Sequence, residues 1–254
     1  MNKINVVDNK IIPFDNTDVI LNNNIITFTN NGDYYLEYIT SNNVNITINV
    51  EDNVCVQLFE YSNNNDINTN ITYNLGKNSS LIISKFYYND NTNEEINIYL
   101  NKKNANIKYN FSSISKNHDN YLINIYHNDS TTNSDIFNRT IAKENSSNNF
   151  DINSYVENKI LDCYLNQSTK IITLGDSNNK INPNMFTHDN SVTAIHASVI
   201  GNVNEEELFY LMSRGISYNE AIKIIIKGII LSNINSNMEY REKILNILEE
   251  VGGE

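Results

Sequence analysis

Tryptophan is absent from this sequence of 254 residues, and proline, cysteine and glycine are scarce, with two, two and eight copies. Two cysteines cannot build a disulfide framework, and the sequence contains no CxxC pair. No run of eighteen or more apolar residues occurs, so no membrane-spanning helix is predicted. Residues 1–5 lack the apolar core of a secretory signal, and we therefore expect a cytoplasmic protein.

Basic residues are also few, with 18 Lys and Arg against 30 Asp and Glu, which gives a formal net charge of −12. Nucleic acids and anionic membranes attract basic patches, so this balance argues against both as partners. No Ser/His/Asp order, glycine-rich nucleotide loop or HExxH motif stands out. We therefore do not expect an enzyme.

Asparagine is instead the commonest residue, at about one in five. The asparagines alternate with Ile, Val, Tyr and Phe, so an apolar pattern persists between them. This interleaving favours a folded β-protein over a prion-like segment, although asparagine richness is typical of both.

An internal repeat runs through the first half of the chain. The segment 45–50 (NITINV) recurs at 70–75 (NITYNL) and, after an equal interval, at 95–100 (EINIYL). A further copy begins at Ile123, a slightly longer interval beyond its counterpart Ile96. A polar turn and a second alternating strand follow each of the first three copies.

Alternating strands at a fixed spacing, with no helix between them, are typical of a β-solenoid. Stacked coils would bury inward-facing Val, Ile and Leu, and asparagine would suit the turns because it tolerates left-handed backbone geometry. A β-sandwich with coincidental spacing is the competing interpretation. Many β-solenoids act on polysaccharides, but the lack of tryptophan and of a secretion signal makes that alternative weak.

The segment 191–216 (SVTAIHASVIGNVNEEELFYLMSRGI) carries the most specific pattern. An extended run of small residues containing His196 turns at Gly201, and Asn204 is expected to cap a helix that ends at Arg214 and Gly215. Two more helices should follow, one opened by a capping box at Ser217 and the other by Ser236. The middle helix is apolar around much of its circumference, so we expect it to lie between layers or beneath a partner.

This segment resembles the signature of the SufB/SufD family, the scaffold proteins of the SUF iron–sulfur cluster assembly machinery. The matching residues are Val192, His196, Gly201, Glu206, Leu208, Phe209, Tyr210, Leu211, Ser213, Arg214, Gly215 and Ile216. A second part of the family pattern, its histidine-containing rung, is matched by Ile125, His127, Asn128, Thr132 and Ser134. The resemblance covers roughly residues 45–250.

The resemblance implies a right-handed parallel β-helix over residues 1–200 and a C-terminal helical subdomain over residues 201–254. It implies a non-enzymatic scaffold that binds an ABC-type ATPase, SufC-like, through its C-terminal helices. The candidate contacts for that ATPase are Glu206, Leu208, Phe209, Tyr210 and Arg214. The end of the β-helix would pair with a SufB-like subunit or with an identical chain.

The resemblance also places a metal ligand at His196, close to the expected subunit contact, where iron or an iron–sulfur cluster would be held transiently rather than stably. A neutral imidazole is a good ligand for iron. The SufB branch has its functional cysteine at a position that falls on about Thr169 here. The chain therefore departs from that branch, which favours a SufD-like role.

The remaining thiols and imidazoles carry weaker signals. Cys163 and Cys55 both lie in alternating strands, and we expect buried structural thiols at each position. His118, His127 and His188 are isolated in the sequence. A protein-interaction solenoid without iron chemistry stays open as the alternative function.

Overall fold

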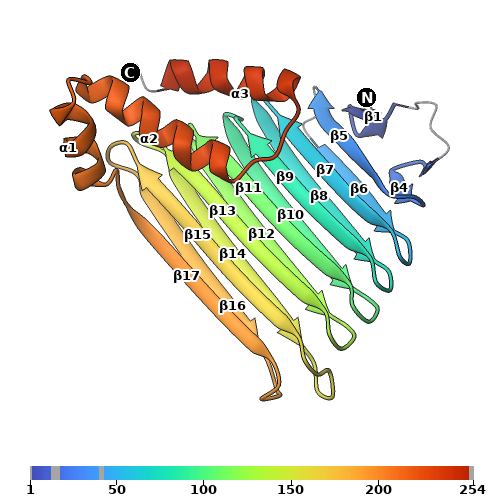
Figure 1. The fold of residues 1–254 in the computed structure, drawn as a ribbon. Coiled ribbons are helices and arrows are strands. Elements are labelled where there is room, and N and C mark those ends of the chain that lie inside the picture. Colours follow the sequence, from blue (N-terminus) through green and yellow to red (C-terminus); the bar gives the residue numbers. More distant parts are fainter. Residues whose placement is uncertain (1, 13–17, 40–42, 252–254) are drawn as a thin grey trace.

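The computed structural model describes residues 2–12, 18–39 and 43–251, and they form a parallel β-solenoid of about six turns with three C-terminal helices (Figure 1). Each complete coil contributes one strand to each of two sheets, which we name sheet A and sheet B. The predicted mainly β solenoid is confirmed, and the β-sandwich alternative is wrong because neighbouring strands within each sheet run parallel from coil to coil.

Sheet A follows the order β17-β15-β13-β11-β9-β7-β5-β1-β2. Its strands are β1 Asn2–Val7, β2 Lys10–Ile11, β5 Gly32–Ile39, β7 Cys55–Ser62, β9 Ser80–Tyr87, β11 Asn106–Ser115, β13 Asn133–Ala142, β15 Tyr164–Thr173 and β17 Thr193–Asn202. Sheet B follows the order β16-β14-β12-β10-β8-β6-β4-β3. Its strands are β3 Val19–Asn22, β4 Ile25–Phe28, β6 Asn43–Val50, β8 Asp66–Leu75, β10 Asn91–Leu100, β12 His118–His127, β14 Ser147–Val156 and β16 Asn178–Phe186.

The strand register follows the sequence repeat. Ile46 pairs with Ile71, Ile71 with Ile96, and Ile96 with Ile123. These isoleucines face inward and are buried, as are the alternate residues on either side of them. One solenoid core therefore runs along the inside of the coils.

Asparagine supplies many of the turns, as predicted. Asn53, Asn78 and Asn104 occupy corresponding turns of successive coils, and each has a positive φ between 53° and 64°. Their side chains also bond to one another, because Asn78 Nδ2 donates to Asn53 Oδ1 at 2.9 Å and Asn104 Nδ2 donates to Asn78 Oδ1 at 2.9 Å. The asparagine content thus serves both turn geometry and stacking of the coils.

Three helices follow the last strand: α1 Glu205–Ser213, α2 Tyr218–Ser232 and α3 Met238–Val251. Asn204 caps α1, and Ser217 with Glu220 forms a capping box at α2, as expected. The expected start of the third helix at Ser236 is wrong. It begins at Met238, and Asn237 Oδ1 accepts the N–H of Tyr240 at 3.0 Å, so an asparagine one position later takes the capping role.

Helices α2 and α3 cover the outer face of sheet A and build a second core (Figure 1). Outward-facing side chains of the sheet, among them Phe59, Phe86 and Ile141, pack against Ile226 of α2 and Tyr240 of α3. Helix α2 also contacts α1, so it lies between sheet A and another helix, as its apolar circumference indicates. Within the described ranges, no helix is long and apolar enough to cross a bilayer.

Candidate functional site

The last coil is open. Strands β16 and β17 end the two sheets, and each pairs on one side only among the described residues (Figure 1). Apolar side chains project from this coil into solvent, with Val199 53% exposed and Phe186 48% exposed. Strand edges with unpaired backbone groups and apolar side chains are templates for association with another chain. Pro183 lies within β16 and lacks an N–H group, which is tolerated because β16 is an edge strand.

An aromatic ladder also reaches the open coil. The rings of Tyr99, Tyr126, Tyr155 and Phe186 stack in that order, with centroids 4.8 to 5.0 Å apart and interplanar angles of 9° to 10°. The Phe186 ring is stacked on the Tyr155 ring, and its side chain is about half exposed at the final coil. The last ring of the ladder therefore adds apolar area to the exposed surface of the open coil.

His196 lies on the inward-facing side of β17. It is in register with Gln167 of β15, whose side chain is buried inside the solenoid. In-register residues of parallel neighbours point to the same face, so the His196 imidazole stands at the mouth of the solenoid interior. The residue itself is exposed because no coil follows β17 in the described chain. Its role as a metal ligand stays a prediction.

Thr169 is also inward-facing and buried, and its hydroxyl accepts a hydrogen bond from Asn138 Nδ2 at 3.0 Å. The position that resembles the cysteine of the SufB branch is thus occupied by a hydroxyl held in a polar interior. In the part of the chain that the structure describes, no three His, Cys, Asp or Glu residues lie close enough to hold a metal ion.

A groove of about 530 Å³ runs between α1 and α2. Its lining is Glu206, Glu207, Tyr210, Leu211, Ile224, Ile225, Gly228 and Ile229. Every residue of α1 is at least partly exposed, with Phe209 74% and Tyr210 58% exposed, whereas α2 buries Ile225 against the rest of the protein. The groove therefore has an apolar floor and two glutamates on its rim.

The five predicted partner contacts all lie on or next to α1, although they do not share one surface. Glu206 and Tyr210 line the groove, and the Arg214 guanidinium lies 5.2 Å from the Tyr210 ring centroid. Phe209 is almost free in solvent. Leu208 is half-buried and lines a separate cavity of about 660 Å³ between the helices and the rim of the solenoid. Whether these residues bind a partner stays a prediction.

The two thiols have different environments. Cys163 is buried as expected, with Sγ 3.3 Å from Thr132 Oγ1. The expectation of a buried thiol at Cys55 is wrong, because its side chain faces solvent while the neighbouring Val54 and Val56 are buried. In β7 the inward-facing side chains are those of Val56 and every second residue after it, so the Cys55 side chain faces outward.

His127, the histidine of the resembling rung, is a buried structural residue. Its Nδ1 lies 2.8 Å from Thr132 Oγ1, and its Nε2 lies 3.0 Å from Ser134 Oγ. Burial lowers the pKa of His127 to about 4, so the imidazole is neutral at physiological pH. The Thr and Ser of the rung pattern are therefore the hydrogen-bonding partners of its histidine. His118 and His188 are both exposed.

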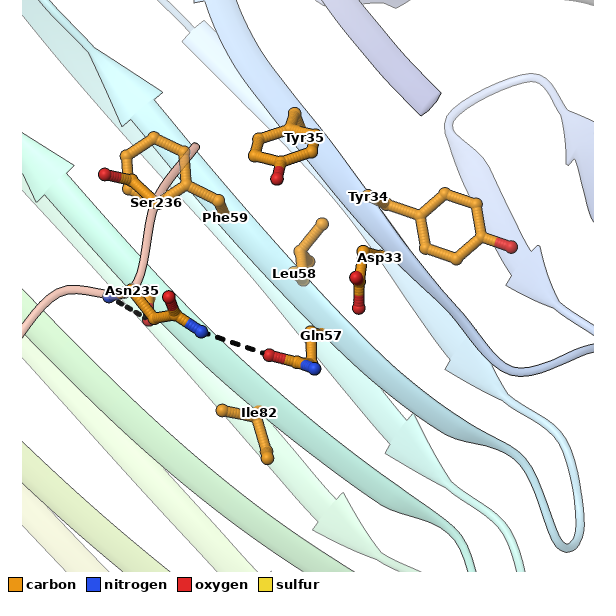
Figure 2. Close-up of a pocket in the computed structure, with 10 residues that line it drawn as sticks. Asp33, Tyr34, Tyr35, Gln57, Leu58, Phe59, Ile82, Asn235 and Ser236 are labelled. Atoms are coloured by element: carbon orange, nitrogen blue, oxygen red, sulfur yellow. Dashed lines mark hydrogen bonds between the residues drawn. The ribbon is translucent and has the colours of Figure 1, made fainter. Parts of the chain in front are cut away.

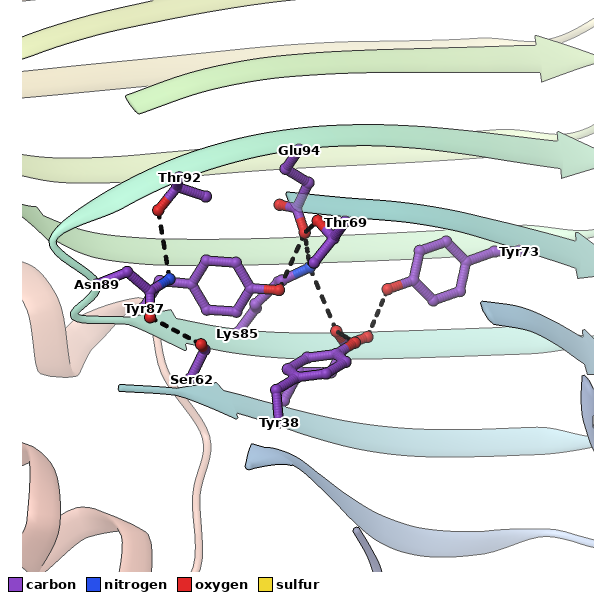
Figure 3. Close-up of polar contacts among 10 residues, drawn as sticks. Tyr38, Ser62, Thr69, Tyr73, Lys85, Tyr87, Asn89, Thr92 and Glu94 are labelled. Atoms are coloured by element: carbon purple, nitrogen blue, oxygen red, sulfur yellow. Dashed lines mark hydrogen bonds and ion pairs between the residues drawn. The ribbon is translucent and has the colours of Figure 1, made fainter. Parts of the chain in front are cut away.

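A charged cluster lies inside the solenoid (Figure 3), and no sequence pattern indicated it. Lys85 is fully buried, and its Nζ lies 2.6 Å from Glu94 Oε1 and 3.3 Å from Glu60 Oε2. Tyr38 donates to Glu60 Oε2 at 2.7 Å, and Tyr73 also donates to the Glu60 carboxylate. Both carboxylates and the ammonium group are thus paired and hydrogen-bonded, as burial of charge requires.

Two further hydroxyls complete the cluster. Thr69 Oγ1 and Tyr87 OH donate to Glu94 Oε1 at 2.8 and 3.0 Å. Burial, together with the Glu94 charge, raises the pKa of Tyr87 well above its ordinary value of 10, so its hydroxyl remains a donor. Glu60 and Lys85 occupy in-register positions on adjacent coils. Their proximity could be predicted from the sequence only once the register between those coils was known.

Asp119 is a third buried acid, on the inward row of β12. Burial raises its pKa from 3.8 to about 7, although the hydroxyls of Ser115 and Thr92 partly oppose that shift. Its Oδ1 makes no hydrogen bond among the described residues. Because its pKa differs between the folded and the unfolded chain, the protonation of Asp119 is coupled to folding.

A small polar cavity of about 210 Å³ lies on sheet A beside the α2–α3 linker (Figure 2). Asn235 of the linker donates through its backbone N–H to Ser84 Oγ at 3.1 Å and through Nδ2 to Gln57 Oε1 at 3.2 Å. Asp33 and Gln57 line the cavity on the sheet side. These bonds fasten the linker to the sheet, and we assign no ligand to the cavity.

The fold class is therefore a parallel β-solenoid with one open coil at its end and C-terminal helices that cover one of its two sheets. The family model described as "SUF system FeS cluster assembly, SufBD core domain" matches residues 19–229. The chain therefore belongs to the SufBD family, and the resemblance seen in its sequence is confirmed.

Two curated relatives support this assignment. The chain is 27% identical over 118 residues to the iron–sulfur cluster assembly protein SufD of Bacillus subtilis, a match that covers 46% of this chain and 27% of that protein. It is 54% identical over 35 residues to an iron–sulfur cluster assembly SufBD family protein of Pyrococcus horikoshii, covering 14% of this chain and 8% of the relative. The matches thus span under a third of either relative.

Proposed function

We propose that this chain is a non-enzymatic scaffold subunit of a SUF-type iron–sulfur cluster assembly complex, with a SufD-like role in the cytoplasm. Family membership supports the assembly role, and the similarity to SufD supports the branch. The observation that carries the proposal is the exposure of apolar side chains over β17 and α1, where the family signature falls. Such exposed apolar surface is typical of sites where a partner binds.

The groove between α1 and α2 is the proposed contact for an ABC-type ATPase, SufC-like. Its floor of Leu211, Ile224 and Ile229 suits an apolar anchor of a helix-in-groove contact. Glu206 and Glu207 on the rim favour a partner surface that carries Lys or Arg. Binding should therefore weaken as salt concentration rises, because rim charges act mainly through screened attraction.

The open coil is the proposed contact for a SufB-like chain or for a second copy of this chain. Edge strand β17 offers unpaired backbone groups, and its side chains Ile195 and Val199 offer apolar area. His196 stands at the same edge, so ligands from both subunits would meet there. Iron or a nascent cluster is the cargo of this site and would be bound transiently.

The groove is tested by a binding measurement between the purified chain and the ABC-type ATPase of the same cell. Ile224→Asp places a charge on the groove floor and should weaken ATPase binding at least about tenfold, the equivalent of about 1.4 kcal/mol. Met238→Asp is the matched control, because Met238 is 78% exposed at the start of α3 and lies outside the groove. Equal binding by both variants and the parent would contradict this contact.

The cargo role is tested by His196→Ala. The variant should fold as the parent does, since His196 is exposed, and should support less cluster assembly on a cluster-accepting protein. Unchanged assembly would remove His196 as a ligand and would favour a protein-interaction solenoid without iron chemistry.

A further inference from the structure

Gln167 is an inward-facing residue of β15 with only 1% of its surface exposed. Its Nε2 donates to Ser154 Oγ at 2.8 Å and to the backbone carbonyl of Asn184 at 3.2 Å. Both N–H groups of the amide are therefore used, and the amide plane is fixed from the sheet B side. Its Oε1 has no hydrogen-bond partner among the described residues. A buried acceptor without a donor costs about 1–3 kcal/mol, so a donor for this oxygen is expected.

Polar residues in register on neighbouring coils bond to one another repeatedly in this solenoid. Asn74 donates to Asn49 at 3.0 Å, Asn153 to Asn124 at 3.0 Å, and Asn166 to Asp135 at 3.0 Å. Each of these pairs occupies matching positions on adjacent parallel strands. The spacing between coils therefore suits a hydrogen bond between an amide and its in-register neighbour.

His196 is the in-register neighbour of Gln167 on the following coil. Its exposed imidazole can rotate, and a neutral imidazole carries one N–H donor and one free lone pair. We propose that Gln167 is a positioning residue: its Oε1 accepts the N–H of His196 and so selects one tautomer of the imidazole. The functional value of this contact rests on the proposed function: the selected tautomer would leave the other ring nitrogen of His196 free to bind cargo iron.

The consequence follows from how histidine ligands are held in proteins. A metal-binding imidazole usually donates its second N–H to a fixed acceptor, which sets the tautomer and the ring orientation. Loss of such an acceptor typically weakens metal binding by about 10- to 100-fold. Gln167 would supply this acceptor from within the same chain, while further ligands would come from the paired subunit.

The tautomer is measured by proton–nitrogen correlation of the imidazole rings in the metal-free protein at about pH 8. The chain has four histidines, and His196→Gln identifies the signals of His196 by their loss. In the parent, His196 should show a single tautomer. Gln167→Leu should give a mixture of both tautomers, whereas Gln167→Glu, which keeps an acceptor oxygen, should retain one. Asn166→Ala, at the neighbouring outward-facing amide, is the control and should match the parent.

An identical His196 spectrum in the parent and in Gln167→Leu would overturn the inference. If Gln167→Leu lowers the melting temperature too far, Gln167→Glu against the parent still decides it, because a carboxylate acceptor must move the ring nitrogen shifts of a bonded imidazole.

Anaerobic titration with ferrous iron alone separates this inference from the proposed function. Gln167→Leu should weaken ferrous iron binding by about 10- to 100-fold relative to the parent. A tautomer set by Gln167 without any iron binding would support the positioning role and contradict the cargo role. Measurable iron binding that is equally tight in the parent and Gln167→Leu would contradict the positioning role and leave the scaffold proposal standing.

Discussion

Lys85 shows what single residues do inside this solenoid. It is the only cation facing Glu60 and Glu94 within the described interior cluster, and all three side chains are shielded from solvent. Their hydrogen bonds to Tyr38, Tyr73, Thr69 and Tyr87 satisfy further lone pairs of the carboxylates. Removing one partner of such a buried charge is strongly destabilising, because the opposite charge is left uncompensated.

Lys85→Met should therefore destabilise the protein by about 3–5 kcal/mol, since it leaves two buried carboxylates without a cation. Urea unfolding of the variant and the parent measures this difference. A triple variant that also carries Glu60→Gln and Glu94→Gln should recover much of the lost stability, because no uncompensated charge remains. If Lys85→Met unfolded at the same urea concentration as the parent, the buried ion cluster would not exist as described.

Asp119 should make stability depend on pH. Its pKa in the folded protein, about 7, lies above its ordinary value of 3.8, so the folded state holds the proton more tightly than the unfolded chain does. The contribution of Asp119 to stability is therefore fully present below about pH 4 and is lost as the pH rises through 7. Asp119→Asn should remove this dependence.

The measurement is the free energy of unfolding of the parent minus that of Asp119→Asn, taken from pH 4 to 8. The difference should fall across this range and level off above pH 7. A difference that stays flat, or that grows with pH, would mean that Asp119 is ionised in the folded protein throughout.

Among the elements, the strands were the most predictable from sequence. Ile46, Ile71 and Ile96 recur at a constant interval because each occupies the same inward position of successive coils, and a constant coil length preserves that interval. The repeat becomes harder to see later, since the interval between paired positions lengthens from Ile123 to Ile152 and again from Ile152 to Pro183. Longer turns in the last coils account for the weaker periodicity there.

The packing of the helices was less predictable, for a physical reason. The outer face of sheet A carries apolar side chains, among them Phe59, Phe86 and Ile141, which alternate with inward-facing residues as in any strand. Only the packing of α2 and α3 over them shows that this face is also a core. The interior ion cluster was missed similarly, because Glu60 and Lys85 are residue types usually found on surfaces. The groove floor depends on how α1 packs on α2, which no local pattern fixes.

Tyr240 should anchor α3 on the sheet. Its ring lies 4.9 Å from that of Phe59 and 5.5 Å from that of Tyr61, and its hydroxyl donates to Glu37 at 3.0 Å. Tyr240→Ala should cost about 3–5 kcal/mol of local stability, as for other large buried aromatic residues. Hydrogen exchange should then quicken in α3 while β8 and β10 remain protected.

Met238→Ala, which truncates an exposed side chain on the same helix, serves as the control and should leave exchange in α3 unchanged. Slow exchange in α3 of the Tyr240→Ala protein would show that other contacts hold the helix to the sheet.

At the scale of the whole molecule, two neighbouring exposed surfaces at the end of the solenoid carry the proposed function. The open coil ends the stack of strands, and α1 follows its strand β17 directly (Figure 1). His196 lies on that coil, whereas the groove lies between α1 and α2. A scaffold chain could thus pair through one surface and carry an ATPase on the other. The second core, which includes Ile172 of β15 and Ile226 of α2, would keep both surfaces in a fixed relation.

The most direct test of this account is the mass of the complex formed by the tagged chain when it is co-expressed with the ABC-type ATPase and the SufB-like protein of the same cell. Size-exclusion chromatography with light scattering gives that mass. We predict a co-eluting species that contains the ATPase and two scaffold chains, well above the 29.1 kDa of a single chain. A species of 29.1 kDa that elutes alone under every nucleotide condition would contradict the scaffold function, although the β-solenoid itself would stand.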